Sequence, residues 1–121
     1  MTKGSNSKQY DLEDRTLAFA RTIRSFVKVL PKTLSNLEDG KQLVKSSGSV
    51  GANYIEANES LSKKDFRMRI KICRTEAKES RYWLKLIDTK GNQDLVKDCN
   101  DLIRVATELM KIFGAILQKS K

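Results

Sequence analysis

Small or apolar side chains recur at alternating steps of four and three along most of this chain. The most regular sets are Phe66, Ile70, Cys73, Ala77, Ser80, Leu84 and Ile87, and then Leu95, Cys99, Leu102, Ala106, Leu109, Phe113 and Ile116. Steps of three and four return to one face of an α-helix, because the helix repeats every ~3.6 residues. The spacing therefore predicts amphipathic helices, each with one face directed at a core.

The same spacing occurs in two earlier segments, so four helices are expected in succession. The first segment contains Leu12, Phe19, Ile23, Phe26 and Leu30, and the second contains Leu43, Ser47, Val50, Tyr54, Ala57 and Leu61. Helices of about 20–28 residues joined by short loops pack as antiparallel bundles. We therefore predict an all-α fold, an antiparallel up-down-up-down four-helix bundle, formed by a single domain over residues 11–121.

Capping residues predict where each helix begins and ends. Asp11 is a good N-cap for the first helix, and Pro31 ends that helix because proline cannot continue the hydrogen-bond ladder. The later signals are a capping box at Ser35-Asn36-Leu37-Glu38, a second capping signature at Ser62-Lys63-Lys64-Asp65, a closing Gly91, and a start near Asn92. We expect the second helix to run to about Glu59.

The second helix contains a glycine-rich segment, residues 46–52. Each glycine costs ~1 kcal/mol in a helix, so propensity alone favours a loop there. The alternating spacing nevertheless passes through the segment without a break. We expect a continuous helix, kinked or straight, whose small residues let another backbone approach closely.

Composition restricts the class of protein. The chain has 121 residues, a net charge of +9, no histidine and two cysteines, Cys73 and Cys99, which both fall on core positions. No apolar run approaches the ~20 residues of a membrane span, and no apolar stretch of a signal peptide follows the N-terminus. We expect a cytoplasmic protein with free buried thiols, no membrane association, and a disordered basic arm over residues 1–10.

A cationic stripe follows the core positions of the third helix, one residue further on. Its members are Arg67, Lys71, Arg74, Lys78, Arg81 and Lys85. Like charges at this spacing repel by about 0.2–0.5 kcal/mol per pair, and the stripe contains no acidic residue. A polyanion would relieve the repulsion, so the first hypothesis is nucleic-acid binding through phosphates, supported by Arg21, Arg24 and Lys28 on one face of the first helix. The scarcity of aromatic residues among these cations favours duplex or structured RNA.

An acidic protein surface is the competing explanation for the cationic stripe. Asp94, Asp98, Asp101 and Glu108 share a face of the fourth helix, and this acidic row could meet the cationic stripe of a neighbouring helix or subunit. The protein would then be an oligomeric adaptor without a nucleic-acid role. A membrane-surface role is weaker, because no exposed apolar face adjoins the cations.

The fourth helix also carries a second apolar row beside its core positions. The row consists of Val96, Ile103, Met110 and Leu117. A face this wide is typical of a helix buried on two sides, inside the bundle and against another subunit. We therefore expect a homo-oligomer with its interface at this row. Deeper burial within a monomer is the alternative.

The sequence offers little apparatus for catalysis. The absence of histidine removes the commonest general base and the usual metal ligand, and no phosphate-binding loop or nucleophile elbow is present. Four polar residues near the core positions, Asn53, Glu56, Glu76 and Glu79, are interpreted as a polar clamp that fixes helix register, with Arg74 and Lys78 as candidate partners of Glu56. We expect no enzymatic activity, no metal and no cofactor.

Three stretches of the chain resemble a known helical family. They are Gln42-Leu43 with Ser47, Ser49–Asn53 and Glu56-Ala57; then Ser62–Phe66; and then Glu76–Glu79 with Tyr82-Trp83-Leu84. The family is the four-helix-bundle proteins first noticed as reading frames in intervening sequences of bacterial 23S ribosomal RNA genes. The resemblance implies closed rings, typically pentamers, and no established enzymatic activity. It also implies a distant relationship to the accessory variability protein of diversity-generating retroelements, a basic bundle that binds reverse transcriptase and nucleic acid.

Overall fold

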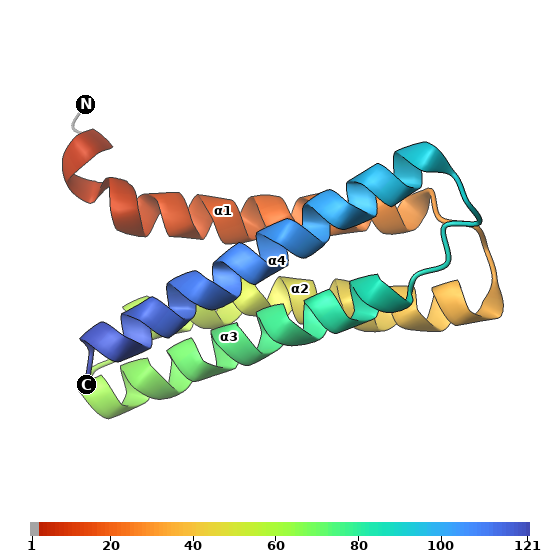
Figure 1. Ribbon diagram of the computed structural model, residues 1–121. Coiled ribbons are helices and arrows are strands. Elements are labelled where there is room, and N and C mark those ends of the chain that lie inside the picture. The colour runs from red at the N-terminus through yellow and green to blue at the C-terminus, as the bar shows by residue number, and fades with distance from the viewer. Residues whose placement is uncertain (1–2) are drawn as a thin grey trace.

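The computed structural model describes residues 3–121, with side chains from Leu12 onward, and contains four α-helices (Figure 1). The helices are α1 (Lys3–Lys28), α2 (Leu34–Asn58), α3 (Lys63–Leu86) and α4 (Gln93–Lys119). Consecutive helices run in opposite directions, and α4 returns to lie beside α1. Each helix therefore contacts two neighbours, and α1 lies diagonally opposite α3. The predicted antiparallel four-helix bundle is confirmed.

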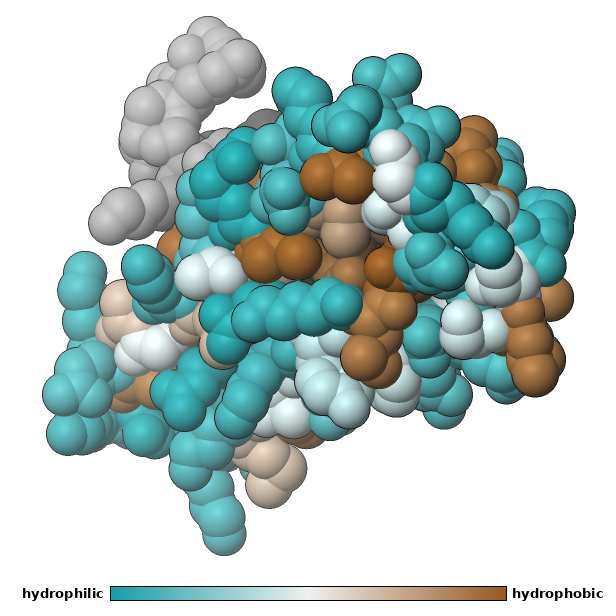
Figure 2. All heavy atoms as spheres, turned by 45° about the vertical axis from the view of Figure 1, so that its right-hand side comes forward, coloured by the Kyte–Doolittle hydropathy of each residue, from teal (hydrophilic) through white to brown (hydrophobic). Residues whose placement is uncertain are grey.

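The alternating spacing identifies the core well. Ile23, Leu43, Ile70, Leu109 and Phe113 are fully buried, and the other core positions form one continuous cluster around them. Leu61 is the exception, since it follows the end of α2 and is 100% exposed. Figure 2 shows further apolar side chains among the hydrophilic ones on one face of the molecule.

Two of the predicted N-caps are present. The Ser62 hydroxyl accepts from the Asp65 amide at 3.0 Å, and the Asn92 side chain accepts from the Leu95 amide at 3.1 Å. Each interaction satisfies one of the amide groups that the first turn of a helix leaves without a partner. The starts of α3 and α4 were therefore correctly predicted.

The predicted start of α2 at Ser35 is wrong. Thr33 is the N-cap, and its hydroxyl accepts from the Asn36 amide at 3.1 Å while its carbonyl accepts from Leu37. A capping box at Ser35 also needs Glu38 to reach back, but Glu38 pairs with Lys41 instead. The helix therefore begins at Leu34, directly after the extended residue that follows Pro31-Lys32.

The first helix begins earlier than Asp11. Residues 1–2 of the segment expected to be a disordered arm lie outside the described residues, and from Lys3 the backbone is helical. No proline interrupts this segment, and an aspartate inside a helix costs only ~0.5–0.7 kcal/mol relative to alanine. Asp11 is therefore an interior residue of α1 and not its N-cap.

The third helix ends at Leu86 and not at Gly91. The Asn36 side chain explains this difference, because its oxygen accepts from the Asp88 amide at 2.9 Å, and in a continuing helix that amide would bond to Leu84. The same Asn36 side chain donates to the carbonyls of Pro31 and Asp88, both at 2.9 Å. One side chain thus joins the α1–α2 loop to the α3–α4 loop. Gly91 takes a left-handed conformation inside the latter loop, with φ at 74°.

The glycine-rich segment is helical, as predicted, and α2 is continuous from Leu34 to Asn58. A Cβ atom placed on Gly51 would lie 2.9 Å from the Thr16 hydroxyl oxygen and 3.7 Å from the Thr16 backbone carbonyl carbon. Real Cβ atoms do not approach other atoms at the shorter distance. Glycine at this position therefore allows α1 to pack close to α2.

Candidate nucleic-acid interface

The arginines of the cationic stripe lie against α4. Arg67 donates to the Leu117 carbonyl and, at 2.8 Å, to the Ser120 hydroxyl, and Arg81 donates to the Thr107 hydroxyl at 3.2 Å. Arg74 lies beside Gly114, where an added Cβ would meet its guanidinium at 3.7 Å. Arg67 places its positive charge at the C-terminal end of α4, where the helix dipole favours cations. The arginines therefore connect α3 to α4.

The lysines of the stripe face solvent. Lys71, Lys78 and Lys85 are exposed, and none of them forms an ion pair with a side chain in the part of the chain that the structure describes. They recur every seven residues, so at 1.5 Å per residue they form a row about 21 Å long. The cationic stripe thus consists of an arginine row that lies along α4, in which Arg67 and Arg81 are half-buried and Arg74 is exposed, and a lysine row open to a ligand.

The cations of α1 belong to a different surface. Arg21, Arg24 and Lys28 are exposed, but α1 lies diagonally opposite α3 and does not contact it. Arg24 lies over Gly48 of α2 and donates to the Ala20 carbonyl of its own helix at 3.2 Å. In a single chain the two sets of cations therefore lie on opposite flanks of the bundle, and the contact of Arg21, Arg24 and Lys28 with phosphates stays a prediction.

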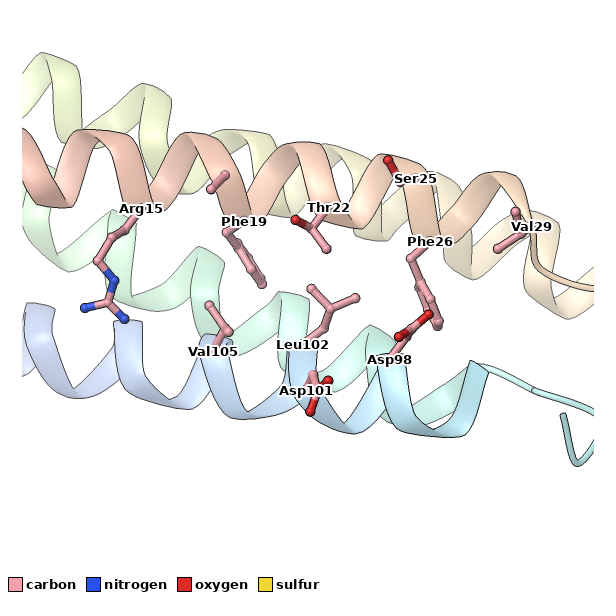
Figure 3. Close-up of a pocket in the computed structure, with 11 residues that line it drawn as sticks. Arg15, Phe19, Thr22, Ser25, Phe26, Val29, Asp98, Asp101, Leu102 and Val105 are labelled. Atoms are coloured by element: carbon pink, nitrogen blue, oxygen red, sulfur yellow. The ribbon is translucent and has the colours of Figure 1, made fainter. Parts of the chain in front are cut away.

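The acidic row of α4 faces α1. Glu108 accepts from Arg15 of α1 at 3.0 Å, and Asp98 and Asp101 border a groove between the two helices (Figure 3). Asp101 pairs with Lys97 at 3.0 Å and with Arg104 at 3.1 Å, and its hydrogen bond with Lys97 lowers the pKa of its carboxyl group. Among the described residues, no member of the acidic row pairs with the cationic stripe.

The second apolar row of α4 packs largely within the chain. Leu117 is buried, and Ile103 and Met110 are half-buried against the core. Val96 is also half-buried. The row adjoins the positions of α4 that the α3 arginines contact. The contact with α3 therefore explains part of the wide apolar face of α4. An oligomer interface at these four residues stays a prediction.

The four residues expected to form a polar clamp have different surroundings. The Asn53 oxygen accepts from Arg69 of α3 at 2.8 Å, while its nitrogen donates to Ser49. Glu56 and Glu79 are exposed and form no ion pair with any described side chain. Burial raises the pKa of the half-buried Glu76, with a further contribution from Glu79, and Lys45 opposes the shift.

The expected pairing of Glu56 with Arg74 or Lys78 is wrong. Glu56 lies near the end of α2, and the antiparallel α3 places Met68, Arg69 and Ile72 beside it. Arg74 and Lys78 lie one to two turns further along α3. Arg69 was not among the residues expected from the sequence. It directly precedes the core position Ile70, whereas the residues of the cationic stripe directly follow core positions. It could therefore have been placed on the opposite side of the third helix, the side that faces α2.

Both cysteines are free and buried, and burial raises the pKa of each thiol, that of Cys73 to about 12. The Cys99 thiol donates to the Leu84 carbonyl at 3.3 Å. Within the described residues, no group of three or more Cys, Asp or Glu side chains is placed to hold a metal ion. None of the helices described contains a stretch that is long and apolar enough to cross a membrane.

The chain is similar to proteins of one family. The family model described as 23S rRNA-intervening sequence protein matches residues 8–115. A crystal structure of a protein of unknown function from the S23 ribosomal protein family of Bacteroides thetaiotaomicron is 29% identical, over 87% of this chain and 96% of that chain, with a TM-score of 0.75. No curated protein matches the sequence. The match over most of its length shows that the chain belongs to the 23S rRNA-intervening sequence protein family.

Proposed function

We propose that this protein is a non-enzymatic nucleic-acid-binding protein, with RNA as the favoured ligand, and that it acts as an oligomeric scaffold. The observation that carries the proposal is the lysine row of Lys71, Lys78 and Lys85, which is exposed and without an ion pair among the described side chains. The phosphates of a nucleic acid would neutralise these charges, and the release of counterions would favour binding.

The arginines behind the lysine row support the same proposal. Arg67 and Arg81 hold α3 against α4 by hydrogen bonds, so the row stands on a rigid surface. A rigid row of point charges suits the regular backbone of a duplex, and it gives affinity without reading the bases. The family is described as 23S rRNA-intervening sequence protein, which makes RNA the first ligand to test.

An adaptor role is the second candidate function. The acidic row lies on the side of α4 that faces α1, whereas the cationic stripe lies on α3, on the other side of α4. The acidic row of one subunit is therefore free to approach the lysine row of another. In that arrangement the protein would be a homo-oligomer, with a pentamer as the expected size from the family resemblance. A role as an accessory to a reverse transcriptase or another RNA-associated system belongs instead to the nucleic-acid-binding proposal.

The test replaces Lys71, Lys78 and Lys85 with glutamine and leaves the bracing arginines intact. The matched control replaces Lys32, Lys41 and Lys90 with glutamine. These lysines are exposed at the loops and on α2, so the control variant loses the same amount of charge. Binding to a fluorescent RNA duplex and a DNA duplex is measured by anisotropy at 50 and 200 mM salt, with light scattering for oligomeric state.

We expect the lysine-row variant to lose up to about three phosphate contacts. Its slope of log K against log salt should then fall by about 2.7, which makes its affinity about 40-fold less sensitive to this change of salt. The control variant should retain most of the slope of the parent. Equal slopes for the two variants would refute nucleic-acid binding by the row, and dissociation of the lysine-row variant into smaller species would favour the adaptor role.

A further inference from the structure

Tyr82 is the one exposed aromatic side chain among those that the structure describes, with 58% of its surface accessible to solvent. It lies on α3 beside the lysine row, four residues after Lys78 and three residues before Lys85. Residues three and four apart are neighbours on one face of a helix. The exposed aromatic ring therefore lies between two exposed cations, each within one helical turn of it.

The Tyr82 ring is held in place by its neighbour Trp83. The two ring centroids lie 5.2 Å apart, and the ring planes meet at 73°. Trp83 is half-buried and packs against the core, so it gives Tyr82 a fixed support. A contact at this angle uses only an edge or one face of the tyrosine ring. At least one face of the ring therefore stays open for stacking.

The two sides of Tyr82 differ in charge. Lys78 and Lys85 lie about 40° and 60° round the helix on one side of Tyr82, and Glu79 lies about 60° round on the other. Glu79 is exposed and forms no ion pair with any described side chain. Phosphates would be attracted to the lysine side and repelled from the glutamate side. The backbone of a nucleic acid would therefore follow the lysine row and direct a base across the tyrosine ring.

We propose that the lysine row binds duplex RNA that carries an unpaired nucleotide, and that the base of this nucleotide stacks on Tyr82. The assignment rests on the proposed function and specifies its ligand. A base inside a duplex is covered by its neighbours on both faces, so only an unpaired or splayed-out base can stack on a side chain. Proteins that bind long single strands stack successive bases on several aromatic side chains. A single exposed ring beside the lysine row therefore favours a duplex with a short unpaired segment.

The probes are two fluorescein-labelled RNAs, a blunt duplex and the same duplex with a short 3′ overhang of adenosines. Tyr82→Leu removes the ring but keeps an apolar side chain, and Tyr82→Phe keeps the ring. Leu86→Ala is the matched control, because Leu86 is 46% exposed and lies one turn further along α3. Fluorescence anisotropy at 50 mM salt gives the affinity of each protein for both RNAs, and light scattering gives the oligomeric state. A third RNA carries 2-aminopurine in the overhang, whose fluorescence is quenched by stacking.

We expect the parent protein to bind the overhang RNA at least about 5-fold more tightly than the blunt duplex, which is the low end of what one base–aromatic stack provides. Tyr82→Leu should lose this preference and bind the blunt duplex as the parent does. Tyr82→Phe and Leu86→Ala should both keep the preference. The 2-aminopurine fluorescence should fall on binding to the parent and to Tyr82→Phe, but not on binding to Tyr82→Leu.

Equal affinity of the parent for the two RNAs would overturn the stacking of a base on Tyr82, as would a preference that survives Tyr82→Leu. Either result, together with binding of the blunt duplex that depends on the lysine row, would leave the proposed function intact. Binding of neither RNA by the parent would refute both. A change of oligomeric state confined to Tyr82→Leu would also overturn the assignment, since the ring would then form a contact between subunits.

Discussion

The contact between Gly51 and Thr16 allows a sharp test of how α1 packs on α2. We expect Gly51→Ala to destabilise the protein relative to Gly114→Ala. The new methyl group at residue 51 would lie 2.9 Å from the Thr16 hydroxyl oxygen and 3.2 Å from the Thr16 Cβ, whereas at residue 114 the nearest atom is 3.7 Å away, on Arg74. Thr16 is 1% exposed and its hydroxyl bonds to the Glu13 carbonyl at 3.0 Å, so the side chain has little room to move.

The two variants share the propensity gain of glycine to alanine in a helix, ~1 kcal/mol. Their difference therefore isolates the overpacking, which costs about 1–3 kcal/mol in a well-packed core. Urea unfolding followed by circular dichroism measures both free energies, and Thr16→Ala should reduce the penalty of Gly51→Ala because it removes the nearest atom. Equal stability of Gly51→Ala and Gly114→Ala would refute the close approach of the two helices at this point.

Three further outcomes are expected. Asn36→Ala should lower the free energy of unfolding by about 2–3 kcal/mol in urea titrations, since it removes three hydrogen bonds that join two loops; a loss below 0.5 kcal/mol would contradict that role. Asn53→Ala should cost about 1–2 kcal/mol by removing the hydrogen bond from Arg69, and the cost should largely disappear in an Arg69→Ala background. The pKa of Cys73, raised by burial to about 12 from 9.0 in the unfolded chain, contributes stability that is complete below pH 9 and is lost as pH rises toward 12. Cys73→Ala should therefore flatten the fall in stability between pH 9 and 11, and an unchanged slope would contradict the shift.

The sequence predicts the bundle well because its core positions depend on one repeating geometric rule. Steps of four and three identified nearly every buried apolar residue, and they correctly carried α2 through the glycine-rich segment. The helix ends were predicted less well. Asn36 decides where α3 stops, and that decision depends on a side chain far away in sequence, so no local signal could reveal it.

The candidate site shows the same division between local and distant causes. The cationic stripe was visible as a pattern, but its division into an arginine row and a lysine row depends on which positions the neighbouring α4 can reach. Arg67 donates to the Leu117 carbonyl at the end of α4, whereas Lys71 lies one turn further along α3, about 40° further round the helix, and faces solvent. The placement of Arg21 and Arg24 on the opposite flank depends on the order of the helices around the bundle, which the pattern does not contain.

The incomplete packing of α1 against α4 has a consequence for how the molecule opens. The extensive contact between α2 and α3 makes that pair the most cooperative unit, while α1 is held chiefly on one side, by α2. Amide hydrogens of residues 12–28 should then exchange together in a sub-global opening, at a lower free energy than those of α3.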